Sequence, residues 1–326
     1  MTMSCFGLGV DIGGSHISLG LIDREGVISC TTRLDMNSVG EGQRWAWICD
    51  QVLSYVATVT GGVGVVVVSY PGPVSVGMQL GSAPTVSRNI AGARAMMATL
   101  RDRLSVSVVP INDIACASFH IGSQRKSQRL LVVSVSSGIG AKVFVGNGVS
   151  GEVISESMIA GEIGHFPIAF DLRVECDCLE INHLQAVASG RGIERVARLV
   201  YGNRLNDVKG ERSHAGQVTE ECVFPAARRK EEWALDVLSK CVRPLVVSIL
   251  PVIACLDVTE VVFIGGVVAH GGPVYEAVVR QGIDKCVANT EWRYHIQSLI
   301  AFERSTNESC LLGALGYAGR RLWDSQ

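Results

Sequence analysis

The chain has 326 residues, of which 48% are hydrophobic and 18% are charged. This composition excludes a disordered chain, and at about 150 residues a domain the length indicates two domains. Because 29 lysines and arginines are balanced by 31 acidic residues, no basic field is available to hold nucleic acid or an anionic membrane by charge alone.

The sequence predicts a soluble, cytoplasmic protein. The N-terminus has no basic segment, and Asp11 interrupts the only early apolar run, so a secretory signal is not expected. The apolar run over 244–256 contains two prolines and falls short of the roughly 20 residues that a membrane span needs. Eleven cysteines without a secretory signal indicate reduced thiols rather than a disulfide framework.

The first part of the chain alternates strand and helix patterns, which is typical of an α/β layer architecture. Short apolar runs bounded by turn residues predict strands at 6–12, 17–22, 27–33, 63–69 and 107–111. Helical spacing predicts helices at 42–58 and 93–104, on either side of the expected strand at 63–69 and of a loop over 71–89.

The strand pattern then restarts. Strands are expected at 130–136 and 141–145, followed by extended chain from residue 149. From Ser15 to Gly26 is eleven residues, and from Ser137 to Gly148 is eleven again, so the chain looks internally duplicated. The remainder reads as helices at 188–201 and 226–247, a polar loop over 202–221 and a buried strand at 261–264.

Three turns that contain glycine each follow an apolar strand: Gly13-Gly14-Ser15, Ser137-Gly138 and Gly265-Gly266. A turn without bulky side chains lets backbone N–H groups converge on phosphate oxygens, so the three together predict a nucleotide clamp. Asp11 beside the first turn suits water-mediated Mg²⁺ coordination. The alternatives are that hairpin corners need glycine in any case, and that Asp11 is a solvated turn residue.

Asn112-Asp113 follows an apolar strand, at the strand end where α/β proteins place ligands. A carboxylate there can accept the proton of an attacking hydroxyl, which phosphoryl transfer to an alcohol requires. The alternative is that Asp113 caps a helix that begins at Ile114.

Four potential metal ligands fall within nineteen residues: His165, Cys176, Cys178 and His183. Two thiolates and two imidazoles match the tetrahedral preference of structural zinc. The alternative is coincidence, because the chain has eleven cysteines.

Taken in order, these motifs resemble the ROK family of sugar kinases and sugar-responsive repressors, within the actin-like ATPase superfamily. The resemblance extends over nearly the whole chain. It is carried by Gly9-Val-Asp-Ile-Gly-Gly-Ser15, Tyr70-Pro-Gly-Pro-Val74, Asn112-Asp113, Gly138-Ile-Gly140, Ala160-Gly-Glu-Ile-Gly-His165, the segment from Cys176 to Gly190, and Ile264-Gly-Gly266.

The resemblance implies an α/β fold of two actin-like ATPase (ribonuclease H-like) domains with an interdomain cleft. We expect an N-terminal domain over 1–118, completed by a C-terminal helix at about 310–326, and a C-terminal domain over 119–309 that contains the zinc segment 165–183. It also implies a homodimer or homotetramer.

The implied activity is ATP-dependent phosphorylation of a hexose primary hydroxyl, with glucose the preferred acceptor, Mg²⁺ bound with ATP, and a structural Zn²⁺. Kinases for an N-acetylated amino sugar, fructose or a cyclitol, or a non-catalytic sugar-sensing protein, are the alternatives. The implied catalytic base is Asp113, and the implied sugar contacts are Gly72, Asn112, Asp113, Glu162, His165 and Gln185. The implied contacts for ATP and its phosphates are Asp11, Gly13, Gly14, Ser15, His16, Ser137, Gly138, Gly265 and Gly266.

This sequence departs from the family pattern at several of these positions. His183 stands in place of a third cysteine, and Gln185 in place of a sugar-contacting glutamate. Two glycines of the zinc segment are Leu179 and Asn182, and His16 replaces a common lysine. Ser136 also replaces the first glycine of the second phosphate turn. The sequence therefore predicts an altered but intact ATP site.

Overall fold

The computed structural model describes residues 6–126, 128–146, 151–205, 218–303 and 308–324. The chain forms two compact units. The first comprises Met1–Lys126, Gly146–Ala160 and Asn307–Gln326, and the second comprises Ser127–Val145 and Gly161–Thr306. The expected domain boundary at 118/119 thus lies eight residues before the end of the first segment at Lys126.

The first unit is built on a five-stranded sheet in the order β3-β2-β1-β4-β5. β1 pairs antiparallel with β2 and parallel with β4, as the sequence-based strand pattern requires of a hairpin followed by a crossover. The strands are β1 (Phe6–Ile12), β2 (His16–Ile22), β3 (Ile28–Asp35), β4 (Val63–Tyr70) and β5 (Ser107–Asn112).

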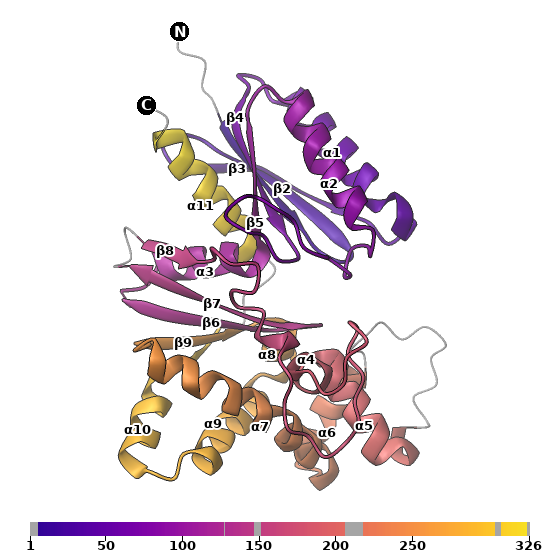
Figure 1. The fold of residues 1–326 in the computed structure, drawn as a ribbon, viewed down its shortest axis with the longest axis vertical. Helices are drawn as coiled ribbons and strands as arrows, with labels where there is room; N and C mark the ends of the chain where they lie inside the picture. The colour runs from indigo at the N-terminus through magenta and orange to yellow at the C-terminus, as the bar shows by residue number, and fades with distance from the viewer. Residues whose placement is uncertain (1–5, 127, 147–150, 206–217, 304–307, 325–326) are drawn as a thin grey trace. The chain divides into compact units, whose positions relative to one another are not determined.

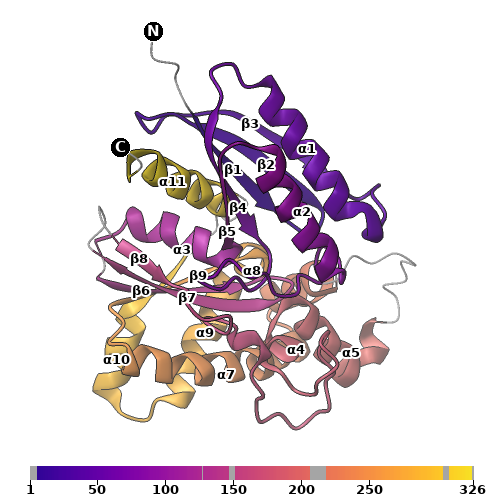
Figure 2. The same cartoon turned by 45° about the horizontal axis from the view of Figure 1, so that its top comes forward.

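Helices cover both faces of this sheet, with α1 and α2 on one face and α11 on the other (Figures 1 and 2). In α1 the buried residues Trp45, Ile48, Cys49 and Val52 recur at helical spacing and face the core. α11 lies close to β1, because a Cβ added at Gly9 would come within 2.8 Å of the Leu315 side chain. The elements are η1 (Glu41–Gln43), α1 (Arg44–Thr58), α2 (Ile90–Arg103), α3 (Asp113–Ser123) and α11 (Ser309–Asp324).

The second sheet repeats the topology of the first. Its order, β10-β9-β6-β7-β8, is that of the first sheet when β6 is set on β1, β7 on β2 and β9 on β4. β6 pairs antiparallel with β7 and parallel with β9, which confirms the expected duplication. The strands are β6 (Arg129–Val135), β7 (Ile139–Gly146), β8 (Gly151–Ile154), β9 (Glu260–Ile264) and β10 (Ile300–Phe302).

The helices of the second unit enclose a single large apolar core with its sheet. They are η2 (Ile163–His165), α4 (Leu184–Ala188), α5 (Gly190–Leu205), a π-helical turn (Thr219–Val223), α6 (Phe224–Arg228), α7 (Glu232–Cys255), α8 (Gly266–Gly271), α9 (Pro273–Cys286) and α10 (Thr290–Leu299). α7 and α9 pack against each other beneath β9 (Figure 1).

Two sequence-based expectations about these helices were wrong, and a third differs from the structure at its first residues. The helix expected at 226–247 is two helices, α6 and α7, separated by a turn at Lys230, whose φ is +62°. The helix expected at 188–201 is α5, which begins at Gly190, while Ala188 ends α4 and Ser189 is extended between the two helices. The loop expected over 202–221 is helical at both described ends, up to Leu205 and from Thr219, and 206–217 lie outside the described residues.

α7 is the one described helix whose length and composition would let it cross a membrane. It has 24 residues and includes Pro244 and Pro251, so the helix is longer than the apolar run over 244–256 that was expected to fall short of a membrane span. Leu245 and Ile249 of this helix are buried in the core of the second unit. The apolar composition of α7 is therefore that of a core helix.

Candidate active site

The end of β5 holds the predicted base. Asn112 is the N-cap of α3, because its Oδ1 accepts a hydrogen bond from the Ala115 N–H at 3.1 Å. Asp113 is therefore the first residue of the helix and not its cap. Its Oδ1 accepts hydrogen bonds from the Ile114 N–H at 2.8 Å and from Asn112 Nδ2 at 3.0 Å. Capping by Asn112 leaves Asp113 held in a defined orientation at the carboxyl end of the sheet.

Asn112 also joins the predicted base to the Pro-Gly turn. Its Nδ2 donates to the Gly72 carbonyl oxygen at 3.1 Å. Gly72 has no room for a side chain, since an added Cβ would lie 2.5 Å from the Ser82 carbonyl oxygen. The structure thus brings together Gly72, Asn112 and Asp113, although Gly72 and Asp113 are 41 residues apart in the sequence.

Asp11 lies in β1, not on the turn that follows it, and it is buried rather than solvated. The alternative that Asp11 is a solvated turn residue was therefore wrong, and its expected role toward Mg²⁺ stays a prediction. The Ser69 hydroxyl of β4 donates to Asp11 Oδ1 at 2.7 Å. Burial raises the pKa of Asp11 to about 6, and the Ser69 hydrogen bond and the charge of Arg33 only partly oppose this shift.

The first glycine turn is a tight hairpin corner in which the Gly13 N–H donates to the His16 carbonyl at 2.9 Å. Ser15 is exposed at its tip, and Arg44 Nη1 donates to the Gly14 carbonyl at 3.3 Å. His16 Nδ1 lies 3.2 Å from the Ser15 hydroxyl. Burial, and then the charge of Arg33, lower the pKa of His16. The ring is therefore neutral at pH 7.

The second unit brings its two glycine turns together with the start of α5. In the turn between β6 and β7 the Ser136 N–H donates to the Gly138 carbonyl at 2.9 Å, and the Gly190 N–H donates to the Ser136 carbonyl at 2.8 Å. Gly265 has φ +106°, and an added Cβ would lie 2.3 Å from the Val135 carbonyl oxygen. The N-termini of α5 and α8 therefore both lie beside the Ser136–Gly138 turn, an arrangement suited to binding anions.

Glu162 and His165 lie on one short segment of the second unit that begins at Gly161. Gly161 has φ +78°, and an added Cβ would lie 1.7 Å from the Ala141 carbonyl, so this position requires glycine. Burial raises the pKa of Glu162, whereas Lys142 and His165 lower it.

Lys142 was missed by the sequence reasoning. It is a buried residue of β7, and its charge favours the ionised form of Glu162. The available signal was a lysine in an otherwise apolar strand.

The four predicted metal ligands form one cluster. The ligand atoms of His165, Cys176, Cys178 and His183 all lie within 4.8 Å of one another. Isolated bridges between Pro167 and His183 and between Glu175 and Ile181 hold the loop. Burial alone would raise the pKa of the Cys176 thiol, but hydrogen bonds from His165, the Cys178 backbone and Gln185 lower it to about 6. This donor set fits a tetrahedral zinc ion.

Leu179 and Asn182 of this loop have positive φ, +74° and +53°. These are the positions at which the family pattern has glycine. The left-handed conformation that glycine adopts freely is thus retained by residues for which it costs energy, about 1–2 kcal/mol for leucine. The backbone at these two positions therefore has the conformation that glycine adopts most easily.

Gln185 lies beside the metal cluster. Its Nε2 donates to Cys176 Sγ at 3.3 Å and lies 3.4 Å from His165 Nε2. The expected contact of Gln185 with the sugar stays a prediction, and the structure adds a hydrogen bond to a metal-ligand thiol.

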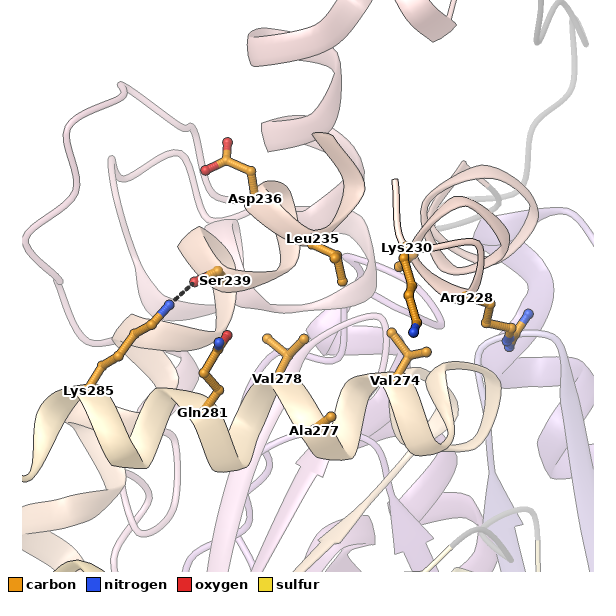
Figure 3. Close-up of a pocket in the computed structure, with 11 residues that line it drawn as sticks. Arg228, Lys230, Leu235, Asp236, Ser239, Val274, Ala277, Val278, Gln281 and Lys285 are labelled. Carbon is orange, nitrogen blue, oxygen red and sulfur yellow. Dashed lines mark hydrogen bonds between the residues drawn. The ribbon is translucent and has the colours of Figure 1, made fainter. Parts of the chain in front are cut away.

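A separate groove lies among α6, α7 and α9, with a volume of about 580 Å³ (Figure 3). Its floor is apolar, and Lys230 and Lys285 project over it, with the Lys285 amine 3.5 Å from the Ser239 hydroxyl. None of the residues that the sequence assigned to sugar, ATP or metal lines this groove.

Two α/β units of repeated topology, each with a five-stranded mixed sheet, define the actin-like ATPase fold. A ROK family glucokinase from Streptomyces griseus, solved with glucose and AMPPNP, has this fold: the TM-score is 0.67 at 21% identity, over 97% of this chain and 99% of that chain. The sequence profile of the ROK family matches residues 7–320, and the chain belongs to that family.

Curated relatives of the chain are kinases of different acceptors. The C(7)-cyclitol 7-kinase of Streptomyces hygroscopicus subsp. jinggangensis is 27% identical over 272 residues, 79% of this chain and 74% of the relative. The N-acetylmannosamine kinase of Escherichia coli O139:H28 is 25% identical over 311 residues, 94% of this chain and 96% of the relative.

Proposed function

We propose that this protein is an ATP-dependent kinase that phosphorylates the primary hydroxyl of a hexose or a related six-membered polyol. The observation that carries the proposal is the geometry at Asp113. Asn112 caps the helix and donates a hydrogen bond to one oxygen of the Asp113 carboxylate. Asp113 is therefore oriented at the strand end and does not itself act as the helix cap. A carboxylate held in this way suits the acceptance of a hydroxyl proton.

In this mechanism Asp113 accepts the proton of the primary hydroxyl as that oxygen attacks the terminal phosphate. The sugar is bound through Gly72 and Asn112, and through Glu162, His165 and Gln185. Asn112 orients the base by its own hydrogen bond. A misplaced base would lose much of the advantage of proximity.

The nucleotide is held by the glycine turns. The phosphates bind to the backbone and hydroxyl groups of Gly13, Gly14 and Ser15 and of Ser137 and Gly138, and the adenosine side binds at Gly265 and Gly266. When Mg²⁺ is bound with ATP, it offsets the negative charge of the phosphates. Asp11 is the carboxylate that would hold this ion through water, and a nearby cation would favour its ionised form.

The His165, Cys176, Cys178 and His183 cluster is proposed to hold a structural zinc ion. Four protein ligands leave no open coordination position, so the metal stabilises a loop and takes no part in the reaction. In this way it would fix His165 and Gln185. We further propose that the protein is cytoplasmic and forms a homodimer or homotetramer. Light scattering of the purified protein tests the oligomeric state.

The acceptor is proposed to be glucose, with cyclitols and N-acetylated amino sugars next in order because relatives at 25–27% identity act on them. A coupled ADP-release assay over glucose, fructose, N-acetylglucosamine, N-acetylmannosamine and C7-cyclitols tests the proposal. Turnover with at least one acceptor supports it. Sugar binding without ADP release for any acceptor would contradict it and favour a sugar-sensing role.

A further inference from the structure

One face of the first sheet carries a row of polar side chains across four strands. The pairing register sets Arg33 of β3 opposite Ser18 of β2, and Ser18 opposite Asp11 of β1. Asp11 is in turn opposite Ser69 of β4. Residues directly opposite each other on neighbouring strands point to the same face, so Arg33 projects on the face where Asp11 meets the Ser69 hydroxyl.

Arg33 is tied to the first glycine turn. Its Nη2 lies 3.2 Å from His16 Nδ1, the atom that also contacts the Ser15 hydroxyl. A neutral imidazole accepts a hydrogen bond from the guanidinium. This single bond leaves most of the five N–H donors of Arg33 available. Among the described residues no carboxylate pairs with Arg33, and its side chain is exposed. The turn therefore has beside it a positioned cation that makes no ion pair among the described residues, although its charge still favours the ionised form of Asp11.

The position of Arg33 relative to Asp11 suits a phosphate with its metal ion. Two strand spacings separate their backbones, about 10 Å, so the two side chains can approach a ligand between them from opposite sides. The pairing register sets Asp11 of β1 opposite Ser69 of β4, and Ser69 opposite Ile111 of β5, two residues before Asp113. Asp11 and the proposed base therefore lie in one region of the first unit. The phosphate nearest that base is the one that is transferred.

We propose that Arg33, held by His16, binds the terminal phosphate of ATP at the first glycine turn. The inference rests on the proposed function and names a residue for it. A planar guanidinium can make two parallel hydrogen bonds to one phosphate, which a point charge cannot. As the γ-phosphate departs from ADP, the same contacts stabilise its negative charge during transfer.

The test is calorimetric binding of Mg²⁺ with AMPPNP, and separately with ADP, to wild type, Arg33→Ala and Arg33→Lys. Loss of a charged contact predicts AMPPNP affinity lower by about tenfold to a hundredfold in Arg33→Ala. The lysine variant is expected to lie in between, and ADP affinity to change by less than about threefold, because ADP lacks the terminal phosphate. Arg24→Ala, which removes an arginine from the far end of the same hairpin, is the matched control.

Equal AMPPNP affinity in wild type and Arg33→Ala would overturn the proposal, as would an equal loss for ADP. Arg33→Gln, which keeps a polar hydrogen-bonding side chain without charge, replaces the alanine variant if melting shows that the latter is poorly folded. If wild type binds nucleotide but phosphorylates no acceptor, the proposed function fails. The AMPPNP comparison still decides whether Arg33 binds the terminal phosphate.

Discussion

The side chain of Asn112 makes hydrogen bonds to three neighbouring groups. Its oxygen caps α3, and its amide nitrogen bonds both the Gly72 carbonyl and the Asp113 carboxylate. Capping residues are usually replaceable among serine, threonine, aspartate and asparagine, but only an amide provides an acceptor for the cap together with donors for two oxygens. The asparagine before the base is therefore a positioning residue.

Replacing Asp113 by asparagine is expected to lower kcat by about 10²–10⁴-fold, because the amide keeps the size of the side chain but cannot accept a proton. Sugar affinity, measured by calorimetry, should change little. Asp102→Asn on the exposed face of α2 is the control. Wild-type turnover in Asp113→Asn would show that the carboxylate is not the base.

Asp11 is expected to destabilise the fold at neutral pH. Its pKa is raised from 3.8 to about 6, so the folded state binds more protons than the unfolded state between these values. The contribution of Asp11 to the free energy of unfolding is therefore fully present below about pH 4 and is lost as the pH rises through about 6. The loss amounts to about 3 kcal/mol. Asp11→Asn should therefore melt above wild type at pH 8, while its turnover falls.

The measurement for Asp11 is the melting temperature of both proteins from pH 4 to pH 8 without nucleotide or Mg²⁺. The advantage of Asp11→Asn should be small at pH 4 and grow to its full value by about pH 7. Parallel curves for the two proteins would contradict the proposed cost of this buried carboxylate. Such a cost is expected where a charged group serves a ligand rather than the fold.

Among the elements, the loop from His165 to His183 is the one that we expect to depend most on the proposed metal ion. Its regular pairing is limited to isolated bridges, and Leu179 has a strained backbone. Purified protein is expected to contain one zinc ion per chain. Cys178→Ser should lose it, lower the melting temperature and weaken sugar binding, since metal-binding energy is also local folding energy.

Cys255→Ser is the matched control for the zinc experiment, because Cys255 is also exposed and lies at the end of α7, away from the cluster. It should keep its zinc and its melting temperature. Wild-type protein without zinc, prepared in the absence of chelator, would remove the structural metal from the account.

At the scale of the whole molecule, the sheets could be predicted and the helices after residue 184 only in part. Val63–Tyr70 and Glu260–Ile264 are buried on both faces and therefore read as continuous apolar runs. Helix ends were harder, because they depend on single residues. The left-handed backbone at Lys230 divides two helices without a glycine or proline at the break, whereas the extended Ser189 is followed by Gly190, at which α5 begins.

The candidate site was predicted where its residues form local motifs. Neighbouring residues such as Asn112 and Asp113 could be recognised in the sequence, although not which of them caps the helix. The buried position of Asp11 depends on Ser69, which pairing across the sheet brings to it from 58 residues away. Lys142 gave too weak a signal, because a lysine in a strand more often extends to solvent.

The proposed function is transfer of the terminal phosphate of ATP to a primary hydroxyl. The most direct test is ³¹P and ¹³C NMR of the product formed by wild type and by Asp113→Asn from ATP and the best acceptor of the panel. The account predicts a phosphomonoester on the exocyclic CH₂OH carbon for wild type and a product yield lower by about two orders of magnitude or more for Asp113→Asn. Phosphate on a ring hydroxyl, release of inorganic phosphate alone, or equal yields from the two proteins would contradict it.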